Sequence, residues 1–361
     1  MTCIPRLHFL RNSSTKITLF IFGLVLVFLF SSIFISSVYS IPFISKKEEV
    51  EMGRKADKQI VLKFGIYQDK ALQLYINTIG QRLVSKLTNK DFKTYHFKLV
   101  DSSDINAFAL PGGYIYVTRG LLAALNNESE LASVIGHEIA HVLFHHGAKN
   151  IIRSIGAQIF AIGGAIASPK NAGKWMAIST AMFQQINLGY GREAELESDS
   201  QGMMNSVEAG YHPFAMVSFL KNLRSQEIMS GQAYHGFQAS HPETKERIVK
   251  AEAFASSLSK KYTNFIDNQK AYLKNLQGLV YGGKTYVKDR RNYKPKYLDI
   301  YKVQTGDSLR SIASNFYNDP RRAYEIAVIN GLKENVDLKN GFLLKIIRDG
   351  AYMDKKVINH N

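Results

Sequence analysis

The chain has 361 residues, of which 45% are hydrophobic and 21% charged, and its formal net charge is +16 at pH 7. This composition excludes a disordered protein, and the length allows a sizeable core with room for a small second domain. The basic excess favours anionic partners such as membrane surfaces or cell-wall polymers. No nucleic-acid-binding motif accompanies it, so we expect no nucleic-acid partner.

The N-terminal residues have the pattern of an export signal. A basic segment precedes the apolar run "ITLFIFGLVLVFLF" at residues 17–30, and the small residues of "SSVYSI" follow. This order predicts a signal peptide over residues 1–40, cleaved after Ser40. The alternative is an inner-membrane anchor at residues 17–35, because this stretch approaches the length of about 20 residues that spans a bilayer. Both interpretations place the rest of the chain in the periplasm or cell envelope. The only cysteine, Cys3, precedes the run, so a cleaved chain contains no disulfide.

Helical and strand patterns follow in turn. Apolar residues at helical spacing predict helices over residues 46–90. "YHFKLVDS" and "YIYVTRGLL" predict strands joined by "SDINAFALPGG". Asn127 with Glu130 resembles the capping box of a helix that Gly147 ends. The glycine-rich apolar residues 150–186 predict a helical hairpin, too short in each half to span a bilayer.

The helix that begins at Asn127 contains the pattern HExxH. His137 and His141 are four residues apart and share one stripe of the helix, and Glu138 is rotated from them by about 100°. Two imidazoles so placed can bind one zinc ion, while the glutamate reaches the attacking water as general base. The pattern therefore predicts a metal site in which Glu138 is catalytic.

A catalytic zinc ion needs a third protein ligand. In "GREAELESDSQGMMNSVEAG", Glu195 and Asp199 share a stripe with the small residues Gly202 and Ser206, which would let this helix approach the HExxH helix closely. We predict Glu195 as the third ligand. Asp199 is predicted to accept a hydrogen bond from a histidine N–H.

Other charged residues near these motifs are predicted to have no ligand role. Glu193 and Glu197 lie on a different stripe, and we expect them to face solvent. His145 and His146 lie in the expected last helical turn, where imidazoles suit the helix dipole. His145 is near the ligand stripe, but we expect it not to bind the metal.

Three separated motifs together resemble one protein family. "NAFALPGGYIYVTRGLL", "HEIAH" and "ELESD" occur in the order found in metallopeptidase family forty-eight, the gluzincins of the HtpX, CAAX prenyl protease, Oma and BepA types. The resemblance covers roughly residues 46–250, and the exported layout resembles the periplasmic BepA-like branch. It implies one zinc ion per chain, held by His137, His141 and Glu195, with Glu138 as base.

The resemblance also implies that substrate lies along Asn106, Ala107, Phe108 and Ala109. A protease that binds its substrate as an added strand gains main-chain hydrogen bonds with little demand on sequence. Pro111, just beyond these residues, suits the edge of a sheet. The alternative is a plain loop between two strands.

His241 precedes Pro242 in "ASHPETKERI", and Arg247 follows. The family has a similar His-Pro with a later arginine. His241 is predicted either to stabilise the oxyanion of the tetrahedral intermediate or to occupy the open zinc position in a latent state. The alternative is a helix cap. Arg247 is predicted to support the ligands through a salt bridge.

The last part of the chain reads as strand, two short helices, strand. "YKVQTGDSLRSIA", "INGL" and "LKNGFLLKI" resemble a LysM domain, a family that binds glycans containing N-acetylglucosamine. This resemblance implies peptidoglycan as a partner and makes Gly306 and Asp307 candidate glycan-binding residues; the alternative is a purely structural unit. The predicted organisation is a signal or anchor at residues 1–40, a metallopeptidase domain at 41–261, a basic connector at 262–299, a βααβ LysM-like domain at 300–348 and a tail at 349–361.

We therefore expect an α+β protein: a mostly helical zincin domain with a small sheet whose edge binds substrate, plus the LysM-like unit. The expected activity is zinc-dependent cleavage of unfolded or misassembled envelope proteins, and the resemblance adds the outer-membrane assembly machinery as a partner. The alternatives are a zinc hydrolase of peptidoglycan and a non-catalytic chaperone or cell-wall adaptor with a structural zinc site.

Overall fold

A computed structural model of the protein describes residues 45–161, 180–181, 189–230, 236–242, 245–283 and 295–352. The predicted export segment, most of the second half of the predicted hairpin and the tail from residue 353 lie outside these ranges. Within them, every helix is too short or too polar to cross a bilayer.

The predicted N-terminal helices are present. Helix α2 (Lys46–Phe64) starts at Ser45, which forms a capping box with Glu48, and ends at Gly65, whose φ of 76° is in the left-handed region. Helix α3 (Lys70–Ser85) starts at Asp69, whose side chain accepts a hydrogen bond from Leu72 N.

The first sheet has the strand order β1-β3-β2. Strand β1 (His96–Val100) runs parallel to β3 (Tyr114–Thr118), and β2 (Ala107–Leu110) pairs antiparallel with the other side of β3. The stretch predicted as a plain connection or an edge strand is thus the edge strand β2. The strand predicted from "YIYVTRGLL" stops at Thr118, because the Thr118 side chain caps helix α4 (Arg119–Ala124).

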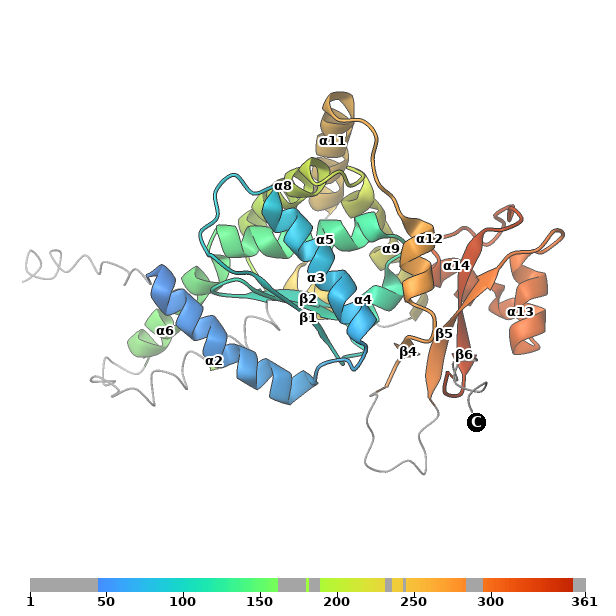
Figure 1. Ribbon diagram of the computed structural model, residues 1–361, viewed down its shortest axis with the longest axis horizontal. Helices are drawn as coiled ribbons and strands as arrows, with labels where there is room; N and C mark the ends of the chain where they lie inside the picture. The colour runs from blue at the N-terminus through green and yellow to red at the C-terminus, as the bar shows by residue number, and fades with distance from the viewer. Residues whose placement is uncertain are drawn as a thin grey trace, which may run out of the picture. The chain divides into compact units, whose positions relative to one another are not determined.

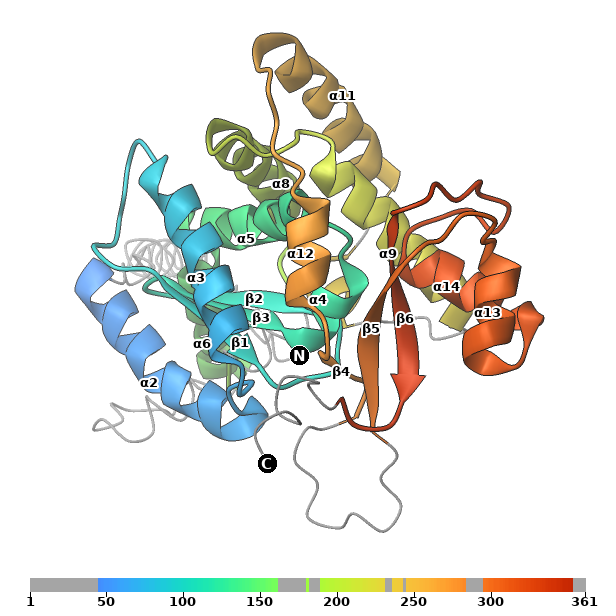
Figure 2. The same ribbon diagram turned by 45° about the vertical axis from the view of Figure 1, so that its right-hand side comes forward.

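Alternating residues of this sheet pack on two layers of helices. Phe108, Leu110, Tyr114 and Tyr116 share a cluster with residues of α2, and the intervening Ala107, Ala109, Ile115 and Val117 belong to the main core. Such alternation follows from the two-residue repeat of a strand. Helix α2 lies on one face of the sheet, and α3 with the HExxH helix α5 lies on the other (Figures 1 and 2).

Helix α5 (Glu128–Leu143) starts at the predicted cap, since Asn127 Oδ1 accepts from Glu130 N at 2.8 Å. The capping box is incomplete, because the Glu130 carboxylate accepts from Asn126 N rather than from Asn127 N. The predicted stop at Gly147 is wrong. His145 turns the chain with a φ of 54°, and Gly147 belongs to the next helix, α6 (His146–Ala161).

Further helices follow as predicted: α8 (Arg192–Glu208), α9 (Ala215–Ser230), α10 (Gly236–Ser240) and α11 (Lys245–Lys261). Helix α8 packs on α5 through glycines. A Cβ atom on Gly202 would lie 2.6 Å from His137 N, and one on Gly136 would lie 2.8 Å from Gly202 O. The predicted close approach of these two helices is confirmed.

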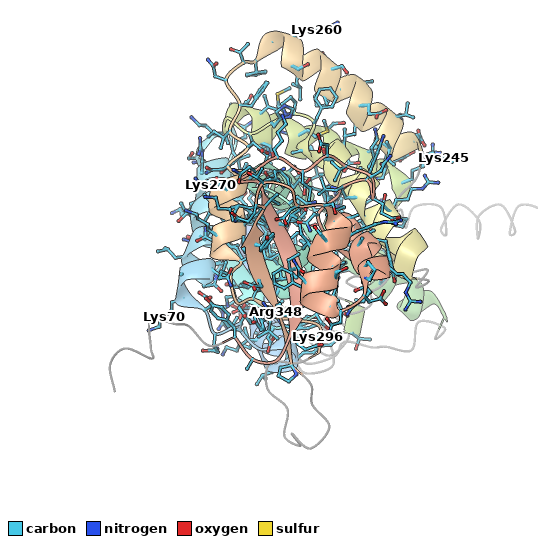
Figure 3. All side chains as sticks on the ribbon, turned by 90° about the vertical axis from the view of Figure 1, so that its right-hand side faces the viewer. Lys70, Lys245, Lys260, Lys270, Lys296 and Arg348 are labelled. Atoms are coloured by element: carbon cyan, nitrogen blue, oxygen red, sulfur yellow. The ribbon has the colours of Figure 1, made fainter. Side chains whose placement is uncertain are left out.

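The C-terminal part has a second sheet, of order β4-β5-β6. Its elements are α12 (Gln269–Asn275), β4 (Val280–Tyr281), β5 (Lys296–Lys302), α13 (Leu309–Tyr317), the short 3-10 helix η1 (Pro320–Arg322), α14 (Ala323–Ile329) and β6 (Leu343–Asp349). Strands β5 and β6 are antiparallel, so Lys296 and Arg348 lie at the same end of the sheet (Figure 3). The order strand, helices, strand is as predicted, and the predicted connector 262–299 contains α12, β4 and the start of β5.

Candidate metal centre

Four side chains from three parts of the chain converge on one buried point. One ligand atom from each of His137, His141, Glu195 and His241 lies within 4.8 Å of all the others. His137 Nε2 and His141 Nε2 are 3.0 Å apart. The Glu195 carboxylate lies 3.4 Å from His137 Nε2 through Oε2 and 3.5 Å from His141 Nε2 through Oε1. The two histidines and the glutamate predicted as ligands are therefore in one cluster.

The chain builds this cluster with two helices in close contact. The spacing of four residues on α5 points both imidazoles to the same side of the helix. Glu195 lies in the first turn of α8, and at Gly136 and Gly202 the backbones of the two helices come close enough that a Cβ atom on either glycine would clash. Because side chains larger than glycine would separate α5 from α8, the position of Glu195 depends on this contact.

Asp199 and Arg247 support the first histidine. Asp199 Oδ1 lies 2.9 Å from His137 Nδ1, the nitrogen that faces away from the cluster. Arg247 Nε and Nη2 donate to the two Asp199 oxygens at 2.8 Å each, and Arg247 Nη1 lies 3.1 Å from Glu195 Oε2. The bidentate pair fixes the Asp199 carboxylate, which in turn fixes the tautomer and orientation of His137.

Neighbouring opposite charges favour the ionised forms of the buried acids and of His137, which burial alone would disfavour. Burial would raise the pKa of Glu195, but the neighbouring His241, His137 and Arg247 hold it well below its usual range. Burial would likewise raise the pKa of Asp199, and Arg247 lowers it. Burial lowers the pKa of His137, yet the two carboxylates beside it raise that pKa to about 9. Glu195 is therefore held as a carboxylate, the form in which it can bind a cation.

Glu138 differs from the other acids of the site. It is fully buried, and neither of its carboxylate oxygens has a hydrogen-bond partner among the described residues. Burial raises its pKa. A buried carboxylate without a hydrogen-bond partner is costly unless the site supplies one. Nitrogen and carboxylate ligands beside such a carboxylate are the donor set that zinc prefers in catalytic sites, so the residues present fit a zinc ion.

His241 lies within the cluster, directly after α10. Its Nδ1 is 3.2 Å from both Glu195 oxygens and 3.3 Å from His137 Nε2, and its Nε2 is 3.3 Å from Glu138 Oε1. Phe237 stacks on the ring with centroids 4.6 Å apart. Both ring nitrogens therefore face the candidate metal ligands and base.

The two histidines after HExxH have different surroundings. His145 lies outside the cluster, as expected, with Nδ1 2.7 Å from Glu49 Oε1 and Nε2 2.7 Å from Asp91 Oδ2. His146 reaches the site from the start of α6, and its Nδ1 lies 2.9 Å from His141 Nδ1. No local pattern in the sequence indicates this contact. Glu197 faces solvent as expected, with its side chain 52% exposed, but its Oε2 also lies 3.2 Å from His146 Nε2.

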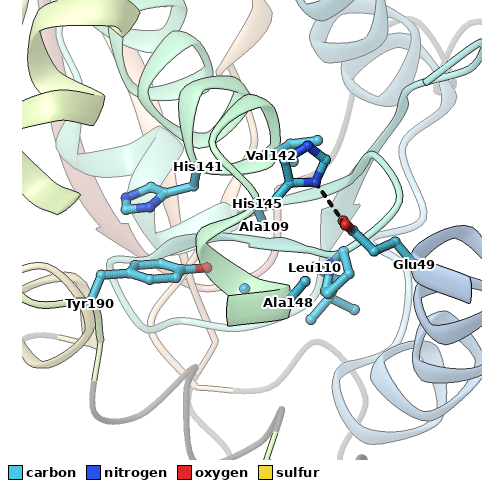
Figure 4. Close-up of a pocket in the computed structure, with 10 residues that line it drawn as sticks. Glu49, Ala109, Leu110, His141, Val142, His145, Ala148 and Tyr190 are labelled. Carbon is cyan, nitrogen blue, oxygen red and sulfur yellow. Dashed lines mark ion pairs between the residues drawn. The ribbon is translucent and has the colours of Figure 1, made fainter. Parts of the chain in front are cut away.

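A small pocket connects the metal site to the edge strand. Ala109, Leu110 and Pro111 form one wall, and His141, Val142 and His145 form another. Tyr190 stacks on His141 at one end, with ring centroids 3.8 Å apart, and the Glu49–His145 pair lies at the other end (Figure 4). The end of β2 is thereby placed beside a candidate ligand.

The start of the predicted substrate strand is held by the segment that contains His241. Asn106 Oδ1 accepts from Ser240 Oγ at 3.1 Å, and Phe237 N donates to Ile105 O at 2.8 Å. Ala107, Phe108 and Ala109 follow in β2, and in the described sheet only β3 pairs with this strand. The outer edge of β2 is therefore free of strand partners in the described parts of the chain.

The predicted glycan-binding residues lie in the C-terminal part, at the turn after β5. Gly306 has a φ of 88° and open space around its Cα. The Asp307 carboxylate accepts from Tyr301 Oη and from Gln304 N, both at 2.7 Å. Asp307 therefore stabilises the turn, whatever it binds.

The fold and the cluster define a class of protein: a metallopeptidase with an HExxH helix and a glutamate ligand from a second helix. Peptidase family M48 matches residues 70–255, about half of the chain. The chain belongs to this family. The predicted family and the predicted enzyme class are thus confirmed, and the mixed helical and sheet fold agrees with them.

Relatives with assigned names include two kinds of peptidase. The chain is 31% identical over 219 residues to the beta-barrel assembly-enhancing protease of Escherichia coli (strain K12), covering 58% of this chain and 44% of that protein. It is 33% identical over 191 residues to the protein of that name in Yersinia pestis, covering 51% and 39%. It is 29% identical over 213 residues to the mitochondrial metalloendopeptidase OMA1 of Schizosaccharomyces pombe, covering 56% and 60%. The chain therefore spans about half the length of these relatives.

Proposed function

We propose that the chain is a zinc-dependent endopeptidase of the bacterial cell envelope that cleaves unfolded or misassembled proteins. The observation that carries this proposal is the convergence of His137, His141 and Glu195 beside the buried carboxylate of Glu138, whose oxygens have no hydrogen-bond partner among the described residues. A structural zinc site has no need of such a carboxylate, which argues against the adaptor alternative. The relatives named beta-barrel assembly-enhancing protease support a role in the assembly of beta-barrel proteins.

The residues of the site divide the chemistry among them. His137, His141 and Glu195 would hold a zinc ion, which would supply Lewis acidity toward the scissile carbonyl and the attacking water. Glu138 takes the proton from that water and later passes it to the leaving amine.

The substrate backbone binds along the outer edge of β2, at Asn106, Ala107, Phe108 and Ala109. An added strand takes its affinity from main-chain hydrogen bonds, so the enzyme requires an extended, flexible chain more than a particular sequence. Unfolded proteins meet this requirement, and folded ones do not.

His241 has two possible roles at this site. Its Nε2, beside Glu138, can donate to the developing oxyanion. Its Nδ1, which faces Glu195 and His137, can instead complete a latent ligand set that must open before substrate binds. In a peptidase assay, His241→Ala lowers the rate in the first case and raises it in the second.

In this proposal the C-terminal unit keeps the enzyme at the cell wall. Its LysM-like sequence favours binding to peptidoglycan near Gly306 and Asp307, and the N-terminal signal delivers the chain to the periplasm. A peptidoglycan-directed hydrolase is the remaining alternative. It would digest purified cell wall while leaving unfolded protein intact.

Zinc content and peptidase activity of the purified chain test the proposal together. We expect about one zinc ion per chain in the parent and in Glu138→Gln, and much less in Glu195→Ala. Only the parent should cleave unfolded casein. A parent without zinc, or a Glu138→Gln variant that cleaves casein at the parent's rate, would overturn the proposed function.

A further inference from the structure

The second histidine of the HExxH pair is held by a chain of hydrogen-bonding groups that the proposed chemistry does not use. His141 Nδ1 lies 2.9 Å from His146 Nδ1, and His146 Nε2 lies 3.2 Å from Glu197 Oε2. Ser198 Oγ lies 3.4 Å from His146 Nδ1. His146 is buried, whereas the Glu197 side chain is 52% exposed. His141, His146 and Glu197 thus form a continuous row of contacts from the candidate metal site to solvent.

The arrangement determines where the protons lie. His141 Nε2 faces His137 and Glu195, so this nitrogen is the one available to a metal. A neutral imidazole that binds through Nε2 carries its proton on Nδ1, and that N–H needs an acceptor when buried. His146 Nδ1 can accept it if the His146 proton is on Nε2, from which it is donated to Glu197. Each tautomer is thus fixed by the next group.

The two histidine ligands have unlike partners on their outer nitrogens. His137 faces Asp199, a buried carboxylate that is held by Arg247. His141 faces the imidazole of His146, and the carboxylate that pairs with His146, that of Glu197, is half-exposed. Stacking of Tyr190 on His141 restrains the plane of that ring but offers its Nδ1–H no acceptor in the stack. The hydrogen bond to His146 is therefore what selects the tautomer of His141.

We infer that His146 is a positioning residue, which accepts the Nδ1 proton of His141 and, through Glu197, holds the ring with Nε2 toward the metal. The inference rests on the proposed zinc site. It assigns the histidine five residues after the HExxH pair to metal retention rather than to helix capping or packing.

Two substitutions at His146 distinguish the effect of its hydrogen-bond acceptor from the effect of its ring. His146→Phe keeps a ring of similar size and removes the acceptor, and His146→Asn places an amide oxygen near the original Nδ1. We expect the zinc affinity of the full chain, measured by competition with a chelating indicator, to fall about 10- to 100-fold in His146→Phe. His146→Asn should retain most of the affinity. The visible absorption of the cobalt-substituted chain should change in His146→Phe and not in His146→Asn.

His145→Asn is the matched control, because it removes the neighbouring histidine, and asparagine tolerates the left-handed backbone at that position. Its zinc affinity should equal that of the parent. Thermal unfolding of each metal-free variant shows whether it folds. Equal affinity in the parent and His146→Phe would overturn the inference, as would equal losses in His146→Phe and His146→Asn, since the acceptor would then be irrelevant. If the parent itself binds no zinc, the proposed function is wrong, and the inference about His146, which depends on it, is wrong as well.

Discussion

Arg247 shows how one residue can hold a buried charge cluster together. Its side chain is 1% exposed and contacts Asp199, Glu195 and the carbonyl oxygens of His241 and Pro242. A buried ion pair need not add net stability, because both charges lose their hydration. Removal of one partner is costly all the same, since it leaves the other charge buried and unpaired.

We predict that Arg247→Met destabilises the protein by about 3–5 kcal/mol, because Asp199 and Glu195 lose their shared counter-charge. Urea unfolding monitored by circular dichroism would measure the change. Arg192→Met is the matched control. Arg192 pairs with Glu246 on the surface, with its side chain 67% exposed, and its loss should cost less than about 1 kcal/mol. Equal stabilities for the two variants would contradict a supporting role for Arg247.

Helix α2 is attached to the end of the HExxH helix by a charged group. His145 lies between Glu49 of α2 and Asp91 of the loop before β1, and Lys46 of α2 also pairs with Asp91. The bond to Glu49 raises the pKa of His145, against partial burial, and Asp91 adds to the effect. The contact therefore couples α2, which follows the predicted export segment, to the metal-binding helix.

We predict that the stability lost in His145→Asn depends on pH. A histidine whose folded pKa exceeds its unfolded value of about 6.5 stabilises the protein fully below that pH, and the contribution is lost as pH rises through the folded pKa. The free energy lost should be about 1 kcal/mol at low pH, the size of a typical net hydrogen bond. Thermal unfolding of the parent and the variant at pH values on both sides of that window measures it. A difference that grows with rising pH would show that His145 is not held as an imidazolium.

These elements also show what the sequence could and could not predict. His137 and His141 follow from the helical repeat, and Glu195 with Asp199 follow from the same spacing and from small residues that allow two helices to meet. The contact between His146 and His141 could not be read in this way. On a continuous helix, five residues place two side chains about 140° apart. They meet only because His145 adopts a φ of 54° and α6 starts in a new direction. The contact between Glu49 and His145 depends on tertiary packing, so no local sequence pattern predicts it.

At the scale of the whole molecule, the C-terminal sheet shares a core with the peptidase helices. Leu298 of β5 and Ile329 of α14 belong to the same buried cluster as Leu131 and Ile135 of α5. Most buried residues of the C-terminal unit, among them Leu309, Ile326 and Leu344, form a separate cluster. Because Leu298 and Ile329 join the main core, we expect the C-terminal unit to unfold together with the peptidase helices in a single transition, whether or not it binds glycans.

Lys345 is the polar centre of this shared core. It lies in β6 with no exposed surface, and its Nζ donates to Ala123 O at 2.8 Å and to Leu125 O at 2.7 Å, at the end of α4. The last carbonyl groups of a helix have no partner within it, so the lysine satisfies acceptors that would otherwise be buried and unpaired. Burial lowers the pKa of Lys345 to about 7, against the attraction of Glu130 at the start of α5.

We predict that Lys345→Met destabilises the whole protein by about 3 kcal/mol, because two buried carbonyl groups lose their hydrogen-bond donor together. Methionine fills similar volume, so lost packing contributes little. Urea unfolding followed by near-ultraviolet and far-ultraviolet circular dichroism measures the change, and Lys339→Met, at an exposed position, controls for the loss of one surface charge. Both variants should keep one transition, with the Lys345→Met midpoint far lower. If that midpoint matched the parent's, the two carbonyl groups would have other partners and the C-terminal sheet would be attached by apolar contacts alone. A variant that unfolded in two steps would instead identify Lys345 as the group that makes peptidase helices and C-terminal sheet one cooperative unit.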